Sequence, residues 1–182
     1  MIRLKYRLET EDHVAFQLYV ASCSKRIKRK RKMVKIGAPI AYLILAAIAF
    51  FVEVIGLGII FALLAILWYF FYPKYEKKRY EKHYRSFVED NLKADSNPEV
   101  VIELTETYIS LTNKNGYSSM KIEVIKEIDE TNKYFFIRFN SGQGLVLPKL
   151  KISNMNEFEK WLNLIIEKHK IKRNINLEWK WK

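Results

Sequence analysis

An apolar stretch of 37 residues, Ile36–Tyr72, constrains this chain of 182 residues more than any other feature. It contains one charged side chain, Glu53. A helix rises about 1.5 Å per residue and the hydrocarbon core of a bilayer is about 30 Å thick, so one straight helix would be nearly twice too long. Two spans, 36–52 and 54–72, fit this thickness, and the sequence predicts a transmembrane helical hairpin. Its turn is expected to hold one acid and two nearby glycines, Glu53, Gly56 and Gly58.

Basic residues gather immediately outside both ends of this stretch. Segment 25–35 carries eight of them and no acid, and segment 74–85 carries six against two acids, which accounts for the whole formal net charge of +12. Lysine and arginine next to membrane spans stay on the cytoplasmic side, so both termini are expected in the cytoplasm. Such residues also attract anionic headgroups, by about 1 kcal/mol each. The side chains expected at the membrane surface are Lys25, Arg26, Lys28, Arg29, Lys30, Arg31, Lys32, Lys35, Lys74, Lys77, Lys78 and Arg79.

Aromatic residues mark the end of the second predicted span. Tryptophan and tyrosine favour the boundary between membrane and water, because one end of each ring system is apolar and the other is polar. The residues expected in this aromatic belt are Trp68, Tyr69, Tyr72 and Tyr75. With both termini in the cytoplasm, the single cysteine, Cys23, is expected to be a reduced thiol.

The residues before the hairpin carry their own pattern. Apolar and basic residues alternate over 2–8, which predicts a half-buried strand. Thr10 is expected to cap a helix whose first turn holds Glu11 and Asp12, and this helix is expected to run on into the membrane. After the hairpin, a cytoplasmic helix should continue the second span. The predicted segments are 1–35 for the strand and basic helix, 36–72 for the hairpin, 73–97 for the cytoplasmic helix and linker, and 98–182 for a β domain.

Short alternating stretches dominate the last segment. The Asn-Gly pair at Asn115-Gly116 predicts a hairpin between a strand at 108–112 and one at 117–121. Further antiparallel strands are expected at 100–105, 122–130, 134–140 and 145–147.

A C-terminal helix is expected to cover this sheet. Asn154 at the cap with Glu157 three residues later begins an amphipathic stripe that includes Phe158 and Trp161. Beyond it, apolar residues alternate over 175–181. This tail is expected either to add a strand to a sheet edge or to place its indoles in the headgroup layer. The predicted fold class is an α+β membrane protein, with a two-helix hairpin and a small antiparallel β domain.

Four short motifs occur in a particular order along the chain. They are Leu8-Glu9-Thr10-Glu11-Asp12-His13, Tyr108-Ile109-Ser110-Leu111 before a turn, Ile125-Lys126-Glu127-Ile128, and Leu145-Val146-Leu147-Pro148-Lys149 ahead of Phe158. In this order the chain resembles the bacterial YcxB-like proteins. The C-terminal part also resembles bacterial pleckstrin-homology-like (PH-like) domains, which implies a seven-stranded, partly open barrel plugged by a helix. The resemblance implies localisation in a bacterial inner membrane with two spans, and it implies no established activity.

Catalytic and metal-binding patterns are absent from the sequence. The three histidines, His13, His83 and His169, are far apart and form no i,i+4 pair. Segment 141–144 is glycine-rich, but it is expected to be a hairpin turn rather than a phosphate loop. Asp129 and Glu130 would point to opposite faces of a strand and would not act as a pair. No enzyme activity, cofactor or metal is therefore expected.

The sequence favours a binding function. The expected protein presents a cytoplasmic PH-like domain at the membrane surface to a protein or lipid partner, as a regulator or scaffold. Its expected partners are a bilayer with anionic headgroups, an unidentified protein and a second copy of the chain. Nucleic acid is not expected, because base-stacking and groove-reading elements are missing beside the basic run. Two alternatives are self-protection against a membrane-acting toxin and an oligomeric channel or transporter whose pathway is lined by Glu53.

Overall fold

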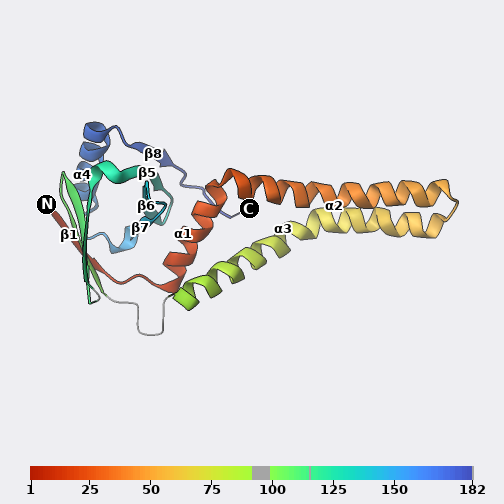
Figure 1. The fold of residues 1–182 in the computed structure, drawn as a ribbon, viewed down its shortest axis with the longest axis horizontal. Coiled ribbons are helices and arrows are strands. Elements are labelled where there is room, and N and C mark those ends of the chain that lie inside the picture. The colour runs from red at the N-terminus through yellow and green to blue at the C-terminus, as the bar shows by residue number, and fades with distance from the viewer. Residues whose placement is uncertain (92–98, 115, 182) are drawn as a thin grey trace. The chain divides into compact units, whose positions relative to one another are not determined.

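The fold contains two compact units. In this computed structural model, residues 1–91, 99–114 and 116–181 are described. The first unit, called the β domain below, comprises residues 1–16 and 87–180, and the second comprises 17–86 together with Trp181. The chain is α+β as predicted: two long apolar helices are followed by strands of two largely antiparallel sheets and by a C-terminal helix (Figure 1).

Two long helices, α2 (Lys25–Phe51) and α3 (Ile55–Asn91), lie side by side in the second unit (Figure 1). Helix α2 begins after Ser24, whose hydroxyl accepts a hydrogen bond from the Ile27 N–H at 3.4 Å. The predicted continuous helix from Thr10 into the membrane is therefore wrong, because a separate helix, α1 (Thr10–Cys23), ends before this cap. The physical reason is that Ser24 caps the start of α2: its hydroxyl accepts a hydrogen bond from a free backbone N–H, and its own extended backbone interrupts the helix.

Residues 52–54 form the turn between the two long helices. Glu53 lies in this turn, as predicted, and has a left-handed φ of 60°. Gly56 and Gly58 lie instead in the first turn of α3, so their predicted place in the turn is wrong. A left-handed residue commonly ends a helix. Because Glu53 supplies that conformation, the chain reverses before it reaches the glycines.

Gly58 has a packing role. A Cβ atom built on it would lie 2.6 Å from the ring of Phe50, so the missing side chain lets α2 and α3 approach closely. Further along, the rings of Tyr42 and Phe61 stack with centroids 6.5 Å apart. These contacts hold the two helices together as a hairpin.

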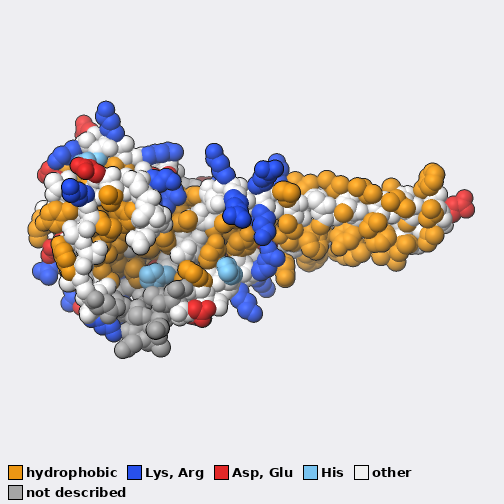
Figure 2. All heavy atoms as spheres, in the orientation of Figure 1, with side chains coloured by type: hydrophobic (Ala, Val, Ile, Leu, Met, Phe, Trp, Pro, Cys, Tyr) orange, Lys and Arg blue, Asp and Glu red, His pale blue; other side chains and the backbone are white. Residues whose placement is uncertain are grey.

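Both long helices are long and apolar enough to cross a membrane. Only 11% and 17% of their most apolar windows is buried, whereas the core helix of a soluble protein would be mostly buried. On the face seen in Figure 2, hydrophobic side chains cover the hairpin between its basic base and its turn. The α2–α3 hairpin thus presents a continuous apolar surface.

Eight strands form two sheets in the described part of the β domain. The first sheet has the antiparallel order β1 (Ile2–Tyr6), β2 (Val100–Leu104), β3 (Tyr108–Asn113) and β4 (Gly116–Lys121). The second has the order β7 (Gly144–Pro148), β6 (Tyr134–Phe139), β5 (Ile125–Glu130) and β8 (Lys172–Ile175), with β8 parallel to β5.

This strand count differs from the seven strands implied by the PH-like resemblance. Strand β1 pairs along its length with β2, so the N-terminal strand belongs to the β domain. The predicted strand at 122–130 begins instead with a 3-10 turn at Ile122–Val124. Of the two alternatives for 175–181, an added edge strand is limited to Ile175, the last residue of β8.

One hydrophobic core lies between the sheets and helix α4 (Met155–His169). The predicted cap is confirmed, since the Asn154 side chain accepts a hydrogen bond from the Glu157 N–H at 3.1 Å. Phe158 of α4 is fully buried and its ring centroid lies 5.0 Å from that of Phe135 on β6. Other core side chains with no exposed area include Ile102, Leu104, Ile109, Ile122, Ile128, Ile137, Leu147, Leu162 and Ile165.

The first turns of α1 cover the other face of the second sheet. The rings of Phe16 and Phe136 lie 5.5 Å apart, and a Cβ atom on Gly144 would overlap the Phe16 ring. The Tyr134 hydroxyl donates a hydrogen bond to the Asp12 carboxylate at 2.9 Å. Burial, together with this carboxylate, raises the pKa of Tyr134 above its ordinary value. The β5–β6–β7 surface is therefore covered on both faces.

Candidate membrane-interface site

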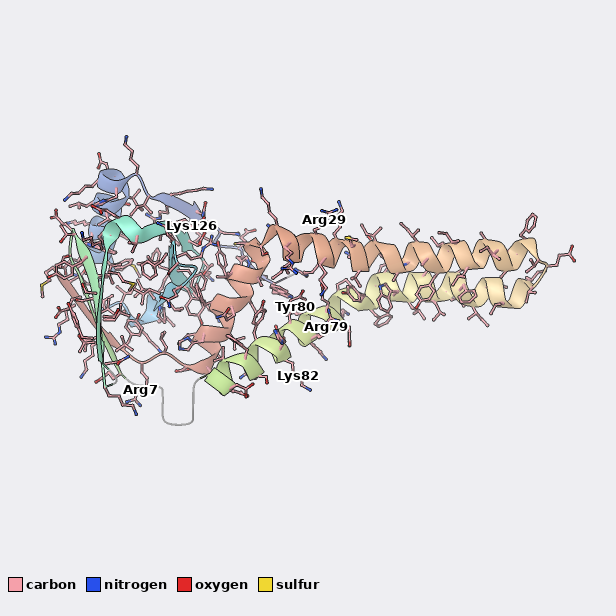
Figure 3. The ribbon with its side chains drawn as sticks, viewed as in Figure 1. Arg7, Arg29, Arg79, Tyr80, Lys82 and Lys126 are labelled. Carbon is pink, nitrogen blue, oxygen red and sulfur yellow. The ribbon has the colours of Figure 1, made fainter. Side chains whose placement is uncertain are left out.

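Lysine and arginine side chains gather at the base of the α2–α3 hairpin, the end away from the turn at 52–54 (Figure 2). The antiparallel packing brings the start of α2, with the run 25–35, beside the part of α3 that carries 74–79. Of the twelve predicted membrane-surface residues, ten are exposed and two, Arg31 and Lys35, are half-buried. Figure 3 labels Arg29 on α2 and Arg79 on α3. The structure thus joins two basic runs, which are separated by residues 36–73 in the sequence, into one cationic region.

An ion pair links the two helices within this region. The Arg31 Nε atom lies 2.9 Å from the Glu76 Oε2 atom. The Tyr72 hydroxyl donates a second hydrogen bond to Glu76, at 3.3 Å. Glu76 is only 3% exposed, so its charge depends on these partners. Arg31, predicted to face the membrane surface, is turned inward for this reason.

Glu76 was not among the predicted site residues, although the sequence contains a signal for its burial. Ala65, Tyr72 and Glu76 are separated by seven and four residues, so they share one face of α3. All three are buried. An acid on the same stripe as buried residues predicts a partner on the facing helix, here Arg31.

The C-terminal Trp181 packs against the same ion pair. Its ring centroid lies 4.4 Å from the Arg31 guanidinium carbon and 5.0 Å from the ring centroid of Tyr80. Such a cation–π contact contributes about 2 kcal/mol where the cation is desolvated. Trp181 is 6% exposed, so its indole is packed at the hairpin base.

The predicted aromatic belt divides into inward and outward residues. Tyr69 and Tyr75 are exposed, whereas Tyr72 is buried. The Trp68 indole donates a hydrogen bond to the Val34 carbonyl at 3.4 Å, and its ring stacks on that of Tyr72 at 5.0 Å. The belt therefore also holds α2 and α3 together.

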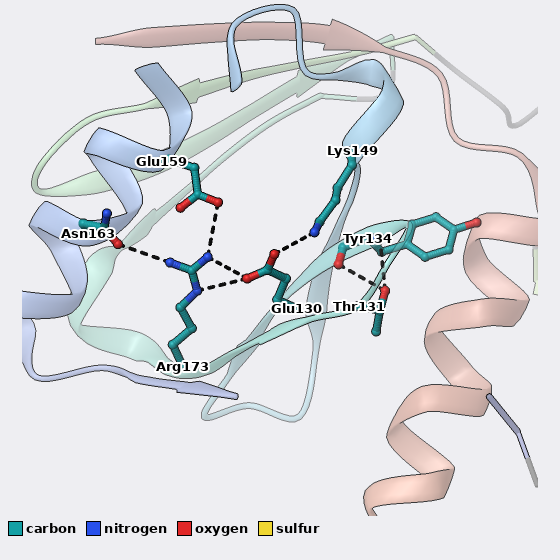
Figure 4. Close-up of polar contacts among 7 residues, drawn as sticks. All are labelled: Glu130, Thr131, Tyr134, Lys149, Glu159, Asn163 and Arg173. Atoms are coloured by element: carbon teal, nitrogen blue, oxygen red, sulfur yellow. Dashed lines mark hydrogen bonds and ion pairs between the residues drawn. The ribbon is translucent and has the colours of Figure 1, made fainter. Parts of the chain in front are cut away.

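A buried polar network lies in the β domain (Figure 4). Glu130 accepts hydrogen bonds from Lys149 Nζ at 2.6 Å and from Arg173 Nη2 at 2.6 Å. Arg173 also contacts Glu159 and Asn163, each at 3.2 Å. Burial by itself would raise the pKa of Glu130, but the hydrogen bonds from the two cations outweigh it and lower the pKa. Every charge in this network is matched.

The neighbouring acid, Asp129, belongs to a separate cluster. Arg138 on β6 lies 2.6 Å from Asp129 and 3.0 Å from Glu127. Asn174 on β8 donates to both acids at 2.8 Å. Asp129 and Glu130 therefore have different partners, as expected for neighbours on a strand.

The other candidate residues lie in separate elements. Histidines occur in α1, α3 and α4, and burial lowers the pKa of His13 despite the opposing effect of Asp12. Among the described residues, no group of three or more His, Cys, Asp or Glu side chains could hold a metal ion. Segment 140–143 joins β6 to β7, so the predicted hairpin turn is confirmed. Cys23 is a free, half-buried thiol.

Comparisons with known proteins agree with the family predicted from the sequence. A family model, described as YcxB-like protein, matches residues 104–165, which run from the end of β2 through most of α4. Neither a search of curated proteins nor a search of solved structures found a match. Over residues 104–165, this chain is similar to the YcxB-like family.

Proposed function

We propose that this protein is a non-enzymatic bacterial inner-membrane protein that presents its β domain at the cytoplasmic surface and binds a protein or lipid partner there. The observation that carries this proposal is the distribution of charge along the α2–α3 hairpin. Residues 36–72 form the apolar part of the hairpin, with one acid in the turn, and lysines and arginines lie at the base of the hairpin. This is the distribution that places the basic end of a hairpin in the cytoplasm.

Labelling of single cysteines tests this orientation. In a Cys23→Ser background, Glu53→Cys in the turn and Lys30→Cys at the exposed base are treated with a membrane-impermeant maleimide on intact spheroplasts. Glu53→Cys should react at once, and Lys30→Cys only after the membrane is permeabilised. Reaction of Lys30→Cys in intact spheroplasts would contradict the proposed topology.

The edge strand β4 is the proposed site of partner binding. It lies at the end of the first sheet, and five of its six residues are exposed. Tyr117 is 67% exposed. An exposed edge can pair with an extended segment of another protein through backbone hydrogen bonds.

A proline substitution can block this edge without breaking the sheet. Antiparallel pairs alternate between hydrogen-bonded and non-hydrogen-bonded. Counting from the pair Asn113↔Gly116 that closes the hairpin, Ser119 falls opposite Ser110 in a non-hydrogen-bonded pair, so its N–H points away from β3. Ser119→Pro therefore removes an outward donor, and Ser119→Thr is the control that keeps it.

The measurement is a crosslinked capture from native membranes with the wild-type chain and both variants. A partner held by wild type and by Ser119→Thr, but lost with Ser119→Pro, would support binding at β4. Identical partners for all three chains would refute it.

A further inference from the structure

A groove of about 440 Å³ lies on the flank of the α2–α3 hairpin. This volume falls in the range of about 300–1,000 Å³ that is usual for ligand pockets. Its walls are apolar and aromatic, and include Tyr42, Leu64, Leu67, Trp68, Tyr72 and Tyr75. If the hairpin crosses a membrane, such a groove faces hydrocarbon chains.

The groove leads into a row of cations on the same face of α3. The spacing from Leu64 to Tyr75 follows steps of three and four residues, which is one helical stripe. Continuing this spacing beyond Tyr75 gives Lys78, Arg79 and Lys82. All three are exposed, and none forms an ion pair with a carboxylate in the part of the chain that the structure describes. Figure 3 labels Arg79 and Lys82 in this row, which we call the α3 cation row.

We propose that the groove and the α3 cation row bind one anionic phospholipid of the surrounding leaflet. One acyl chain would lie along the groove, and the phosphate and headgroup would lie against Lys78, Arg79 and Lys82. This inference rests on the proposed function, because it requires the hairpin to be inserted in the membrane. It adds a defined site and a defined lipid class to the general attraction of basic residues for headgroups.

The side chains at the groove favour a lipid over a second protein helix. Transmembrane helices associate closely through small residues, whereas this flank presents leucine and aromatic side chains. Charge then selects among lipids. A zwitterionic headgroup would place its ammonium group near three cations, whereas an anionic headgroup meets only favourable charge.

The walls of the groove are fixed before any lipid binds. Trp68 is held by its hydrogen bond to the Val34 carbonyl and by stacking on Tyr72. Tyr72 in turn donates to Glu76, which Arg31 holds in place. A preorganised site loses less conformational entropy on binding.

The test uses the purified full-length chain in detergent, titrated with dioleoyl phosphatidylglycerol or dioleoyl phosphatidylcholine, with bound lipid counted by native mass spectrometry. The triple variant Lys78→Gln, Arg79→Gln, Lys82→Gln removes the α3 cation row. A matched control, Lys28→Gln, Arg29→Gln, Lys30→Gln, removes the same charge from exposed positions on α2.

The wild-type chain should retain one phosphatidylglycerol and prefer it over phosphatidylcholine. Loss of the α3 cation row should weaken phosphatidylglycerol binding by roughly a hundredfold, since each of the three basic residues near an anionic surface contributes about fivefold. The control should retain the wild-type preference. Leu67→Trp, which fills the groove, should lower retention while leaving the cations in place.

Equal binding of both lipids, or equal losses in the two triple variants, would overturn the proposed site. Extraction of membranes with alkaline carbonate separates this failure from failure of the proposed function. A chain that stays in the membrane pellet but lacks the preference refutes only the lipid site. A chain released into the supernatant refutes membrane insertion, and the lipid site with it.

Discussion

Replacing Glu130 with glutamine should destabilise the β domain by about 2–4 kcal/mol. The Glu130 carboxylate accepts hydrogen bonds from Lys149 at 2.6 Å and from two nitrogens of Arg173 at 2.6 and 3.1 Å. Its side chain is 9% exposed and each cation's side chain is 20% exposed. Removing one partner of a buried ion pair costs about 3–5 kcal/mol. Partial hydration of both cations, and the remaining contacts of Arg173, offset some of this loss.

The assay is chemical unfolding of the full-length chain in detergent micelles, followed by near-ultraviolet circular dichroism. Glu159→Gln is the matched control, because Glu159 also contacts Arg173 but has a side chain that is 33% exposed. An exposed pair of this kind contributes about 0–1 kcal/mol. Glu130→Gln should therefore cost clearly more than Glu159→Gln.

The pH dependence provides a second check. The pKa of Glu130 is lowered from its ordinary value of 4.5, since the hydrogen bonds from Lys149 and Arg173 outweigh the opposing effect of burial. A lowered carboxyl pKa contributes stability that is present above the unfolded-state value and is lost as the pH falls through the folded-state value. The stability difference between wild type and Glu130→Gln should thus shrink below pH 4.5. A difference below about 1 kcal/mol at neutral pH, or one that persists unchanged in acid, would refute the reasoning.

Three further predictions concern other parts of the fold. Phe158→Ala, at a fully buried core position, should lower the free energy of unfolding by about 3–5 kcal/mol in the same assay. Gly58→Val should lower the free energy of unfolding of the hairpin by about 1–3 kcal/mol, because the new side chain would overlap the Phe50 ring of α2. Gly56→Val is the control and should have a smaller effect, because no atom lies within 4 Å of the added Cβ. Burial lowers the pKa of His13 below 6.5 against the opposing charge of Asp12, so the free energy of unfolding should fall as the pH drops below 6.5. In His13→Gln, the free energy of unfolding should depend less on pH in this range.

Short-range patterns predicted much of the β domain. The cap and stripe that begin at Asn154 correspond to α4, and alternation together with turn residues predicted β1, β2, β3, β4, β6 and β7 to within a few residues. These signals depend on neighbours within about four residues, which the sequence displays directly. The two long apolar helices were also predicted, because an apolar stretch of that length is recognised from composition alone.

Features that depend on distant partners or on one backbone conformation were not predicted. Ser24 divides α1 from α2, although the apolar and basic pattern runs through it without a break. Glu53 adopts the left-handed turn in place of the nearby glycines. The Arg31–Glu76 pair and the packing of Trp181 join segments that are 45 and 150 residues apart, and no local pattern records such contacts.

Strand β5 shows how acids and cations are balanced within the β domain, while the net positive charge lies in the long helices. It is an interior strand of its sheet, yet it contains Glu127, Asp129 and Glu130. A strand covered on both faces holds three acids only if cations reach each of them, and Arg138, Arg173 and Lys149 do so. These positive charges are neutralised within the β domain. The net charge of +12 therefore resides in the runs at 25–35 and 74–85, where exposed side chains can attract an anionic membrane surface.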